Sequence, residues 1–179
     1  MGVNKKGFTF IEIVVVITVI ALALPALFTI IFIILQQQTK IMHLTEVKRE
    51  GDYAMNVMEN LIRNYAAGMQ TAANAPVCAD QTSSDTSFDH FVDNINKNTF
   101  SFAIDSSNRI ASSSSIMTTV DLTDKNVNVS GWSMTCTRSN KYSPPLIKMQ
   151  FNIQYTTTST RPEDTVSLNY QTAVQMKSY

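Results

Sequence analysis

Residues 5–12 read KKGFTFIE, and residues 13–35 continue as IVVVITVIALALPALFTIIFIIL without a single charged side chain. As a helix, residues 13–35 would be about 35 Å long, whereas the hydrocarbon core of a bilayer is about 30 Å thick. The segment is therefore long enough to cross a membrane. Glu12 stands at its start, and a carboxylate inside an apolar helix costs about 3 kcal/mol, so it is usually retained for a partner or a function.

The composition divides the chain into an apolar rod and a polar head. The 14 basic and 14 acidic residues cancel, and no block of like charge indicates direct binding of nucleic acid. Apolar residues dominate the first 35 positions, and no small-residue cleavage pattern of a secretory signal follows them. Ser, Thr, Asn and Asp are frequent afterwards. We therefore expect a single-pass anchor, with Lys5 and Lys6 favouring a cytoplasmic N-terminus.

The helix is expected to continue beyond the membrane. Apolar or small residues recur at helical spacing, and they are Ile41, Leu44, Gly51, Ala54, Met58, Leu61 and Tyr65. Gly51 weakens such a helix by about 1 kcal/mol relative to Ala. Pro25 removes one backbone hydrogen bond and predicts a kink or a loosened turn. The helix should end between Gly68 and Pro76, where Gly, Asn and Pro accumulate.

The remaining chain predicts mainly strands. Period-two alternation runs through residues 100–104, 127–136, 147–155 and 166–176, with turn residues at 105–108 and a possible bulge at Gly131. A short helical turn is expected at 88–95, and the serine run 112–115 is interpreted as a flexible loop. One-sided strands predict an antiparallel sheet that packs on the second half of the helix. The fold class is therefore α+β.

The segment Lys5–Glu12, followed by the apolar run, resembles the N-terminus of type IV prepilins and pseudopilins. In that family a membrane peptidase cuts after the glycine and methylates the new amine. The resemblance implies that Gly7 ends a leader and that Phe8 becomes the methylated N-terminus. It also makes Glu12 the fifth mature residue, which recruits the next subunit. Phe10 replaces the usual leucine.

The resemblance implies a domain plan and a function. The plan is a leader (1–7), a transmembrane and filament-core helix (8–35), its amphipathic continuation (36–76) and an extracytoplasmic head (77–179). The function would be that of a structural subunit of a pilus-like filament or a type II secretion pseudopilus, displayed on the cell surface, with no enzymatic activity and no cofactor. The expected partners are the prepilin peptidase and methylase, other pilin or pseudopilin subunits, and an inner-membrane assembly platform.

Physical chemistry supports a pairing role for Glu12 but leaves an alternative. A buried ammonium and a buried carboxylate are each costly alone, and together they neutralise each other and fix the register of packed helices. The alternative is a carboxylate at the membrane interface, where the helix dipole favours negative charge.

Cys78 and Cys136 lie in the expected extracytoplasmic part, where an oxidising compartment favours a disulfide over two free buried thiols. By the loop-entropy model, this bond would stabilise the head by about 4 kcal/mol. Two cysteines at this separation do not form a zinc site.

Two other functions are compatible with parts of the sequence. One alternative is a binding or sensor domain on an uncleaved membrane helix. Another is an anchored hydrolase that uses Asp89, His90 and a nearby serine, although the chain has no GxSxG, phosphate-loop or HExxH motif. The acidic cluster at 80–93 is interpreted as solvated turns, because its spacing matches no calcium loop. His43 is expected on the helix surface.

Overall fold

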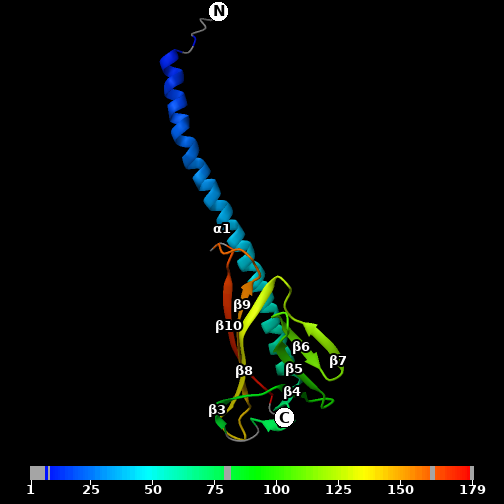
Figure 1. The fold of residues 1–179 in the computed structure, drawn as a ribbon. Helices are drawn as coiled ribbons and strands as arrows, with labels where there is room; N and C mark the ends of the chain where they lie inside the picture. Colours follow the sequence, from blue (N-terminus) through cyan, green and yellow to red (C-terminus); the bar gives the residue numbers. More distant parts are fainter. Residues whose placement is uncertain (1–6, 8, 79–81, 162–163, 178–179) are drawn as a thin grey trace, which may run out of the picture.

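The computed structural model describes residues 7, 9–78, 82–161 and 164–177. Helix α1 (Phe10–Tyr65) forms the axis of the molecule, and its first half stands free of the head (Figure 1). The helical assignment passes through Pro25 without interruption, and the helix bows gently along its length. One continuous helix therefore forms the apolar rod with its first half and enters the head with its second half.

The helix ends earlier than the expected range from Gly68 to Pro76. The N–H of Ala66 still bonds to the carbonyl of Ile62, and strand β1 (Ala66–Gln70) then begins at once. Ala66 and Met69 are both buried, and β1 pairs with strand β4 (His90–Asp93). Burial of these side chains in a sheet outweighs the helical preference of the segment before the glycine is met.

One antiparallel sheet has the strand order β2-β1-β4-β5-β6-β7. Its further members are β2 (Pro76–Val77), β5 (Thr99–Ile104), β6 (Ile110–Ser114) and β7 (Met117–Asp121). The expected helical turn at 88–95 is wrong, because β4 occupies His90–Asp93 and Phe91 stacks on Phe100 of β5. The expected loop at 112–115 is also wrong for Ser112–Ser114, which pair with β5 and β7.

A second antiparallel sheet has the order β10-β9-β8-β3. Its strands are β3 (Thr82–Ser87), β8 (Val127–Arg138), β9 (Leu146–Tyr155) and β10 (Ser167–Gln175). The predicted strands at 127–136, 147–155 and 166–176 are thereby confirmed. The bulge is confirmed as well, because the β8–β9 register shifts between Ser130 and Ser133, and Gly131 has φ +62°. A positive φ of this kind favours glycine.

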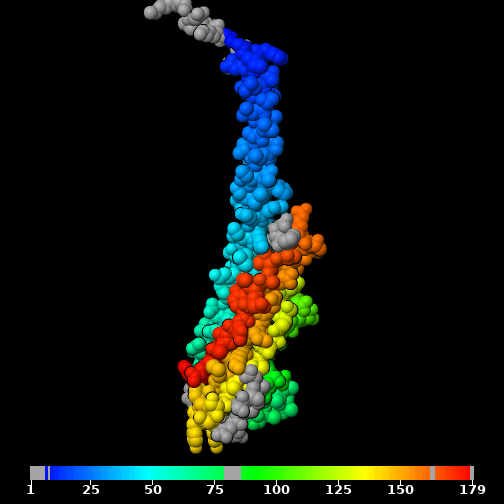
Figure 2. Space-filling model, turned by 90° about the vertical axis from the view of Figure 1, so that its left-hand side faces the viewer, coloured from blue at the N-terminus to red at the C-terminus, as the bar shows by residue number. Residues whose placement is uncertain are grey.

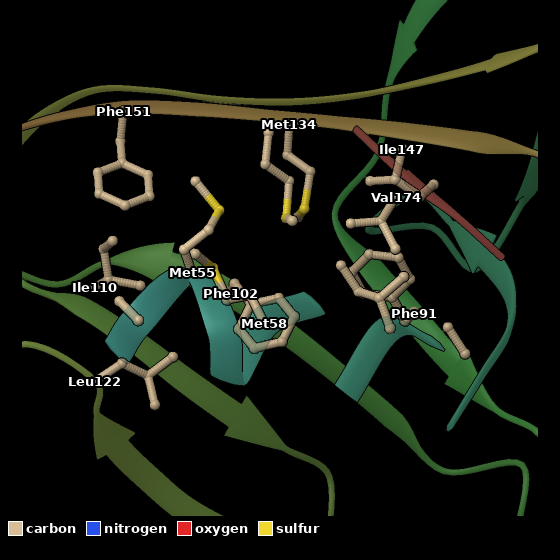
Figure 3. Packing of buried hydrophobic residues seen from close by; sticks show 14 of the residues in the cluster. Met55, Met58, Phe91, Phe102, Ile110, Leu122, Met134, Ile147, Phe151 and Val174 are labelled. Carbon is tan, nitrogen blue, oxygen red and sulfur yellow. The ribbon is translucent and has the colours of Figure 1, made fainter. Parts of the chain in front are cut away.

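The core lies where the second half of α1 passes between the two sheets. Figure 3 shows Met55 and Met58 of the helix gathered with Phe91, Phe102 and Ile110 of the six-stranded sheet and with Met134, Ile147, Phe151 and Val174 of the four-stranded sheet in one hydrophobic cluster. The prediction of a helix packed by its second half on an antiparallel sheet is confirmed, but with two sheets in place of one. The Cys78–Cys136 disulfide is formed and links the β2 end of one sheet to β8 of the other.

Candidate functional site at the start of the helix

Glu12 takes part in a capping box at the first turn of α1. The Glu12 carboxylate accepts a hydrogen bond from the backbone N–H of Thr9 at 3.4 Å, and the Thr9 hydroxyl accepts one from the N–H of Glu12 at 3.4 Å. The N–H of Glu12 also donates to the backbone carbonyl of Thr9 at 3.1 Å, so it is shared between two oxygens of Thr9. The pair of reciprocal bonds is the capping box that commonly closes the first turn of a helix. The carboxylate therefore points toward the N-terminal end of the rod, where the helix dipole also favours negative charge.

Gly7 precedes this cap and is exposed. A Cβ added at Gly7 would meet no atom within 4 Å, so the backbone at this position is open to an approaching protein. Lys5, Lys6 and Phe8, the other residues of the predicted processing signal, lie outside the described residues.

The rod behind the cap is apolar and uncovered. The side chains of its large hydrophobic residues are exposed, from Phe10 at 83% to Leu35 at 55%, and none of its most apolar part is buried against the head. Figure 2 shows it as a slender shaft above the head. A helix of this length and composition can cross a membrane. Apolar surface on this scale requires lipid or other helices to cover it.

Glu12 is the one charged side chain between Gly7 and Leu35 among the described residues. It borders a shallow hollow whose other lining side chains are Ile13, Val16 and Ile17. A positive group that docks from a neighbouring helix would meet one carboxylate in otherwise apolar surroundings. In such surroundings a charge-assisted hydrogen bond is short and strong.

In the described part of the head, the residues of the alternative catalytic and metal sites make local hydrogen bonds. Asp89 accepts a hydrogen bond from the N–H of Ala72 at 2.7 Å, and His90 contacts the side chain of Gln70 at 3.3 Å. Asp93 accepts the N–H groups of Ile95 and Asn96 in a turn. Within the described parts of the chain, no three His, Cys, Asp or Glu side chains come together as metal ligands. Asp80 and the side chain of Asp85 lie outside those parts.

His43 is placed where the rod enters the head. Its ring lies 3.9 Å from that of Tyr155, and its Nε2 lies 3.8 Å from a carboxylate oxygen of Asp164. The β9–β10 connection is thus held against α1 at this level, and His43 is half-buried rather than a free surface residue. These contacts join residues far apart in the sequence, so helical spacing alone could not predict them.

One functional contact was missed that the sequence does encode. Thr9 stands three residues before Glu12, and the pattern T-x-x-E ahead of an apolar run is a capping-box signature. Thr9 is therefore a local partner of Glu12 that the sequence encodes, in addition to any charged partner on another helix.

Comparison with protein families identifies the segment that contains Glu12. Residues 3–24 match the family model described as the prokaryotic N-terminal methylation motif. Curated proteins and solved structures yield no match. The matched segment contains Gly7, the capping box and the first turns of the rod, so it coincides with the site described above.

Proposed function

Because the chain is a member of the type IV pilin and pseudopilin family, anchored in a membrane by its apolar N-terminal helix, we propose that it is cleaved after Gly7, methylated at Phe8 and built into a filament. The peptidase and methylase would act on the segment around Gly7. Other pilin or pseudopilin subunits and an inner-membrane assembly platform would be the later partners. The chain would be a substrate of enzymes and not an enzyme itself.

The observation that carries this proposal is the position of Glu12. Its carboxylate is directed toward the N-terminal end of an uncovered apolar rod and is held there by Thr9. Cleavage after Gly7 would leave an ammonium on Phe8, so each rod would begin with a positive charge and carry a negative one a turn later. A neutral N–H donor such as that of Thr9 is weaker than an ammonium, so a neighbour's amine can displace it.

Packing many such rods together would cover the apolar side chains that the isolated chain exposes. Residues 8–35 would form the filament core, and the head would lie outside. With Lys5 and Lys6 favouring a cytoplasmic start, the head would be extracytoplasmic, in keeping with its disulfide.

Two variants separate assembly from capping. Glu12→Ala removes both the cap and the carboxylate, whereas Thr9→Ala breaks the cap and leaves the carboxylate in place. If Glu12 pairs with a neighbour's amine, Glu12→Ala reduces incorporation into sheared surface filaments at least tenfold, and Thr9→Ala leaves most of it. Cleavage, measured by intact mass, should be unchanged in Glu12→Ala.

Equal incorporation of Glu12→Ala and the unaltered chain would contradict the assembly role. An equal loss in both variants would assign Glu12 to capping alone. An intact mass that still includes residues 1–7, in cells that contain the peptidase, would contradict processing and favour an uncleaved anchor.

A further inference from the structure

Several exposed apolar side chains of the head border one hollow. The hollow has a volume of about 350 Å³ and lies between the last turns of α1 and the β6–β7 hairpin. Leu61 and Tyr65 line it from the helix, and Ile116 and Met117 line it from the hairpin. Tyr65, Ile116 and Met117 are exposed. Single exposed apolar residues need no explanation, but several that gather around a hollow mark a contact site.

The floor of the hollow continues the core beyond the end of the helix. Phe100 and Phe102 lie on the same face of β5, and Phe102 is buried in the core. Opposite them on β6 stand Ser114 and Ser112, which line the hollow together with Phe100. Because α1 ends at Tyr65, this part of the sheet is left without a helix to cover it. The hollow therefore combines an apolar wall with hydroxyl groups.

A single aromatic side chain projects from another part of the head. Tyr142 lies in the β8–β9 connection, residues 139–145, which we call the Tyr142 loop. Its side chain is 89% exposed, more than that of any other large hydrophobic residue in the described part of the chain. Tyrosines that dock in a partner's pocket are among the residues that contribute most to binding energy.

Hydrogen bonds hold the Tyr142 loop in one conformation. The side-chain oxygen of Asn140 accepts the N–H groups of Tyr142 at 2.9 Å and of Ser143 at 2.8 Å. The guanidinium of Arg138 donates to the carbonyl oxygens of Lys141 at 2.6 Å and of Ser143 at 2.7 Å. A loop that is already ordered loses little entropy when its side chain docks, so its projecting ring suits an interface.

The Tyr142 loop and the hollow are separate surfaces of the head. Figures 1 and 2 show the β8–β9 connection at the end of the head farthest from the rod. None of its residues lines the hollow. Tyr142 therefore does not fill the hollow of its own chain, and the ring that enters the hollow must come from another molecule.

We propose that Tyr142 of one copy inserts into the hollow of a second copy. The ring would cover the apolar wall, and the phenol hydroxyl would find partners in the Ser112 and Ser114 hydroxyls at the floor. Lys141 precedes the ring, and Asp93, the one charged residue among the described residues that line the hollow, has the opposite sign. This inference rests on the proposed function, because packing of the rods brings the copies together.

The contact would be repeated along an assembly. Each copy carries one Tyr142 loop and one hollow, so a copy can give its ring to one neighbour and receive a ring from another. Contacts between two different surfaces of the same protein generate rings or open helical filaments, whereas a contact of one surface with itself closes a pair. The arrangement therefore suits a filament in which neighbouring heads touch.

The test places cysteines beside the contact and keeps Tyr142 in place. Lys141→Cys and Ile116→Cys are made in the full chain, and a short thiol-specific cross-linker is added in micelles and, separately, to sheared surface filaments. The native cysteines do not react, because they form a disulfide. The chain with both substitutions should give a ladder of dimers, trimers and larger products. A mixture of the two single variants should give dimers only, and each single variant alone should give none.

Two controls identify the ring as the cause of the ladder. Tyr142→Ser, added to the chain with both cysteines, should lower the cross-linked fraction at least tenfold, and an unchanged thermal unfolding curve shows that this variant is folded. Asn128→Cys in place of Ile116→Cys is the matched control, because Asn128 is exposed and does not line the hollow. It should give no ladder.

The proposal is overturned if Tyr142→Ser leaves the ladder unchanged, or if neither preparation gives a ladder. Dimers of either single variant alone would show a contact of one surface with itself and would also overturn it. So would filaments in which Ile116→Cys cross-links only to a different protein. Loss of filaments with an intact ladder in micelles would contradict the proposed function alone, whereas filaments without a ladder would contradict this inference alone.

Discussion

At the scale of single residues, Tyr170 connects the head to the helix. Its hydroxyl lies 3.0 Å from both the carbonyl oxygen of Lys48 and a carboxylate oxygen of Asp52. Its ring stacks on Phe151. Burial, and then the neighbouring Asp52 carboxylate, raises the pKa of the Tyr170 phenol well above its usual value. The folded head therefore requires the protonated phenol.

This requirement predicts a specific dependence of stability on pH. Tyr170→Phe should lower the free energy of unfolding by about 1 kcal/mol at pH 8, because the single O–H donor shared by the Lys48 carbonyl and the Asp52 carboxylate is removed. Since the pKa of the phenol is higher in the folded state, its contribution is present below about pH 10 and is lost as the pH rises further. The difference between the two proteins, measured by urea unfolding from pH 8 to pH 11, should shrink.

Tyr142→Phe provides the control. Tyr142 is 89% exposed, so its substitution should change the free energy of unfolding little at any pH from 8 to 11. A difference between Tyr170→Phe and the unaltered chain that stays constant to pH 11 would show that the phenol is not held in its neutral form.

The residues of the processing and assembly site could be predicted because their signal is local. A glycine after two lysines and one carboxylate in an apolar run are visible without any fold. Tyr170 could not be predicted in the same way, because its partners Lys48 and Asp52 lie more than a hundred positions away in the chain.

At the scale of elements, Gly51 explains how closely β10 approaches α1. A Cβ at Gly51 would collide with the ring of Tyr170, which its stacking and hydrogen bonds hold in place. The residue that weakens the helix by propensity thus permits the tight contact between helix and sheet.

Gly51→Ala should therefore destabilise the protein, although alanine favours helices by about 1 kcal/mol. Overpacking against a fixed ring costs about 1–3 kcal/mol, so we expect a net loss in the free energy of unfolding measured with urea. Asn56→Ala, on the exposed side of the same helix, should instead be neutral or stabilising. A gain in stability for Gly51→Ala would refute the close contact.

Strands were predictable where alternation was long and one-sided, as in β8, β9 and β10. The segment 88–95 misled because Phe88, Phe91 and Ile95 follow helical spacing, although His90–Asp93 forms strand β4. Pairing of β4 with β1 and β5 decided the outcome, and pairing between distant segments is not encoded in local spacing. The serine run at 112–115 is likewise decided by strand pairing. The hydroxyl oxygens of Ser113 and Ser101 lie 2.8 Å apart across the sheet.

At the scale of the whole molecule, the rod contributes nothing to the core of the head. The buried residues of α1 begin at Val47, and no described residue before it belongs to the core cluster. A chain that starts at residue 36 should therefore fold with its disulfide and unfold cooperatively, within about 0.5 kcal/mol of the full chain.

Far-UV circular dichroism during urea unfolding measures this difference, with the full chain held in micelles. A chain that starts at residue 60 is the control, because it lacks Val47, Ala54, Met55 and Met58 and should not unfold cooperatively. Loss of cooperative unfolding in the 36–179 chain would show that the rod supports the head after all.

The division into rod and head was predictable, because composition changes abruptly after residue 35. The arrangement of the strands as two sheets around the helix was not. The alternation in β5 and in β9 assigns each strand an inward face, but it does not say which neighbour pairs with which edge.

The unbroken course of α1 from Phe10 to Tyr65 has a mechanical consequence. The second half of the helix is packed in a head that a disulfide cross-links, so no hinge separates the rod from the head. Torque applied at the membrane end of the rod is therefore transmitted directly to the head. Any rotation of the rod about its own axis would turn the head through the same angle. In an assembly, the way in which the rods pack would then set the direction in which each head faces.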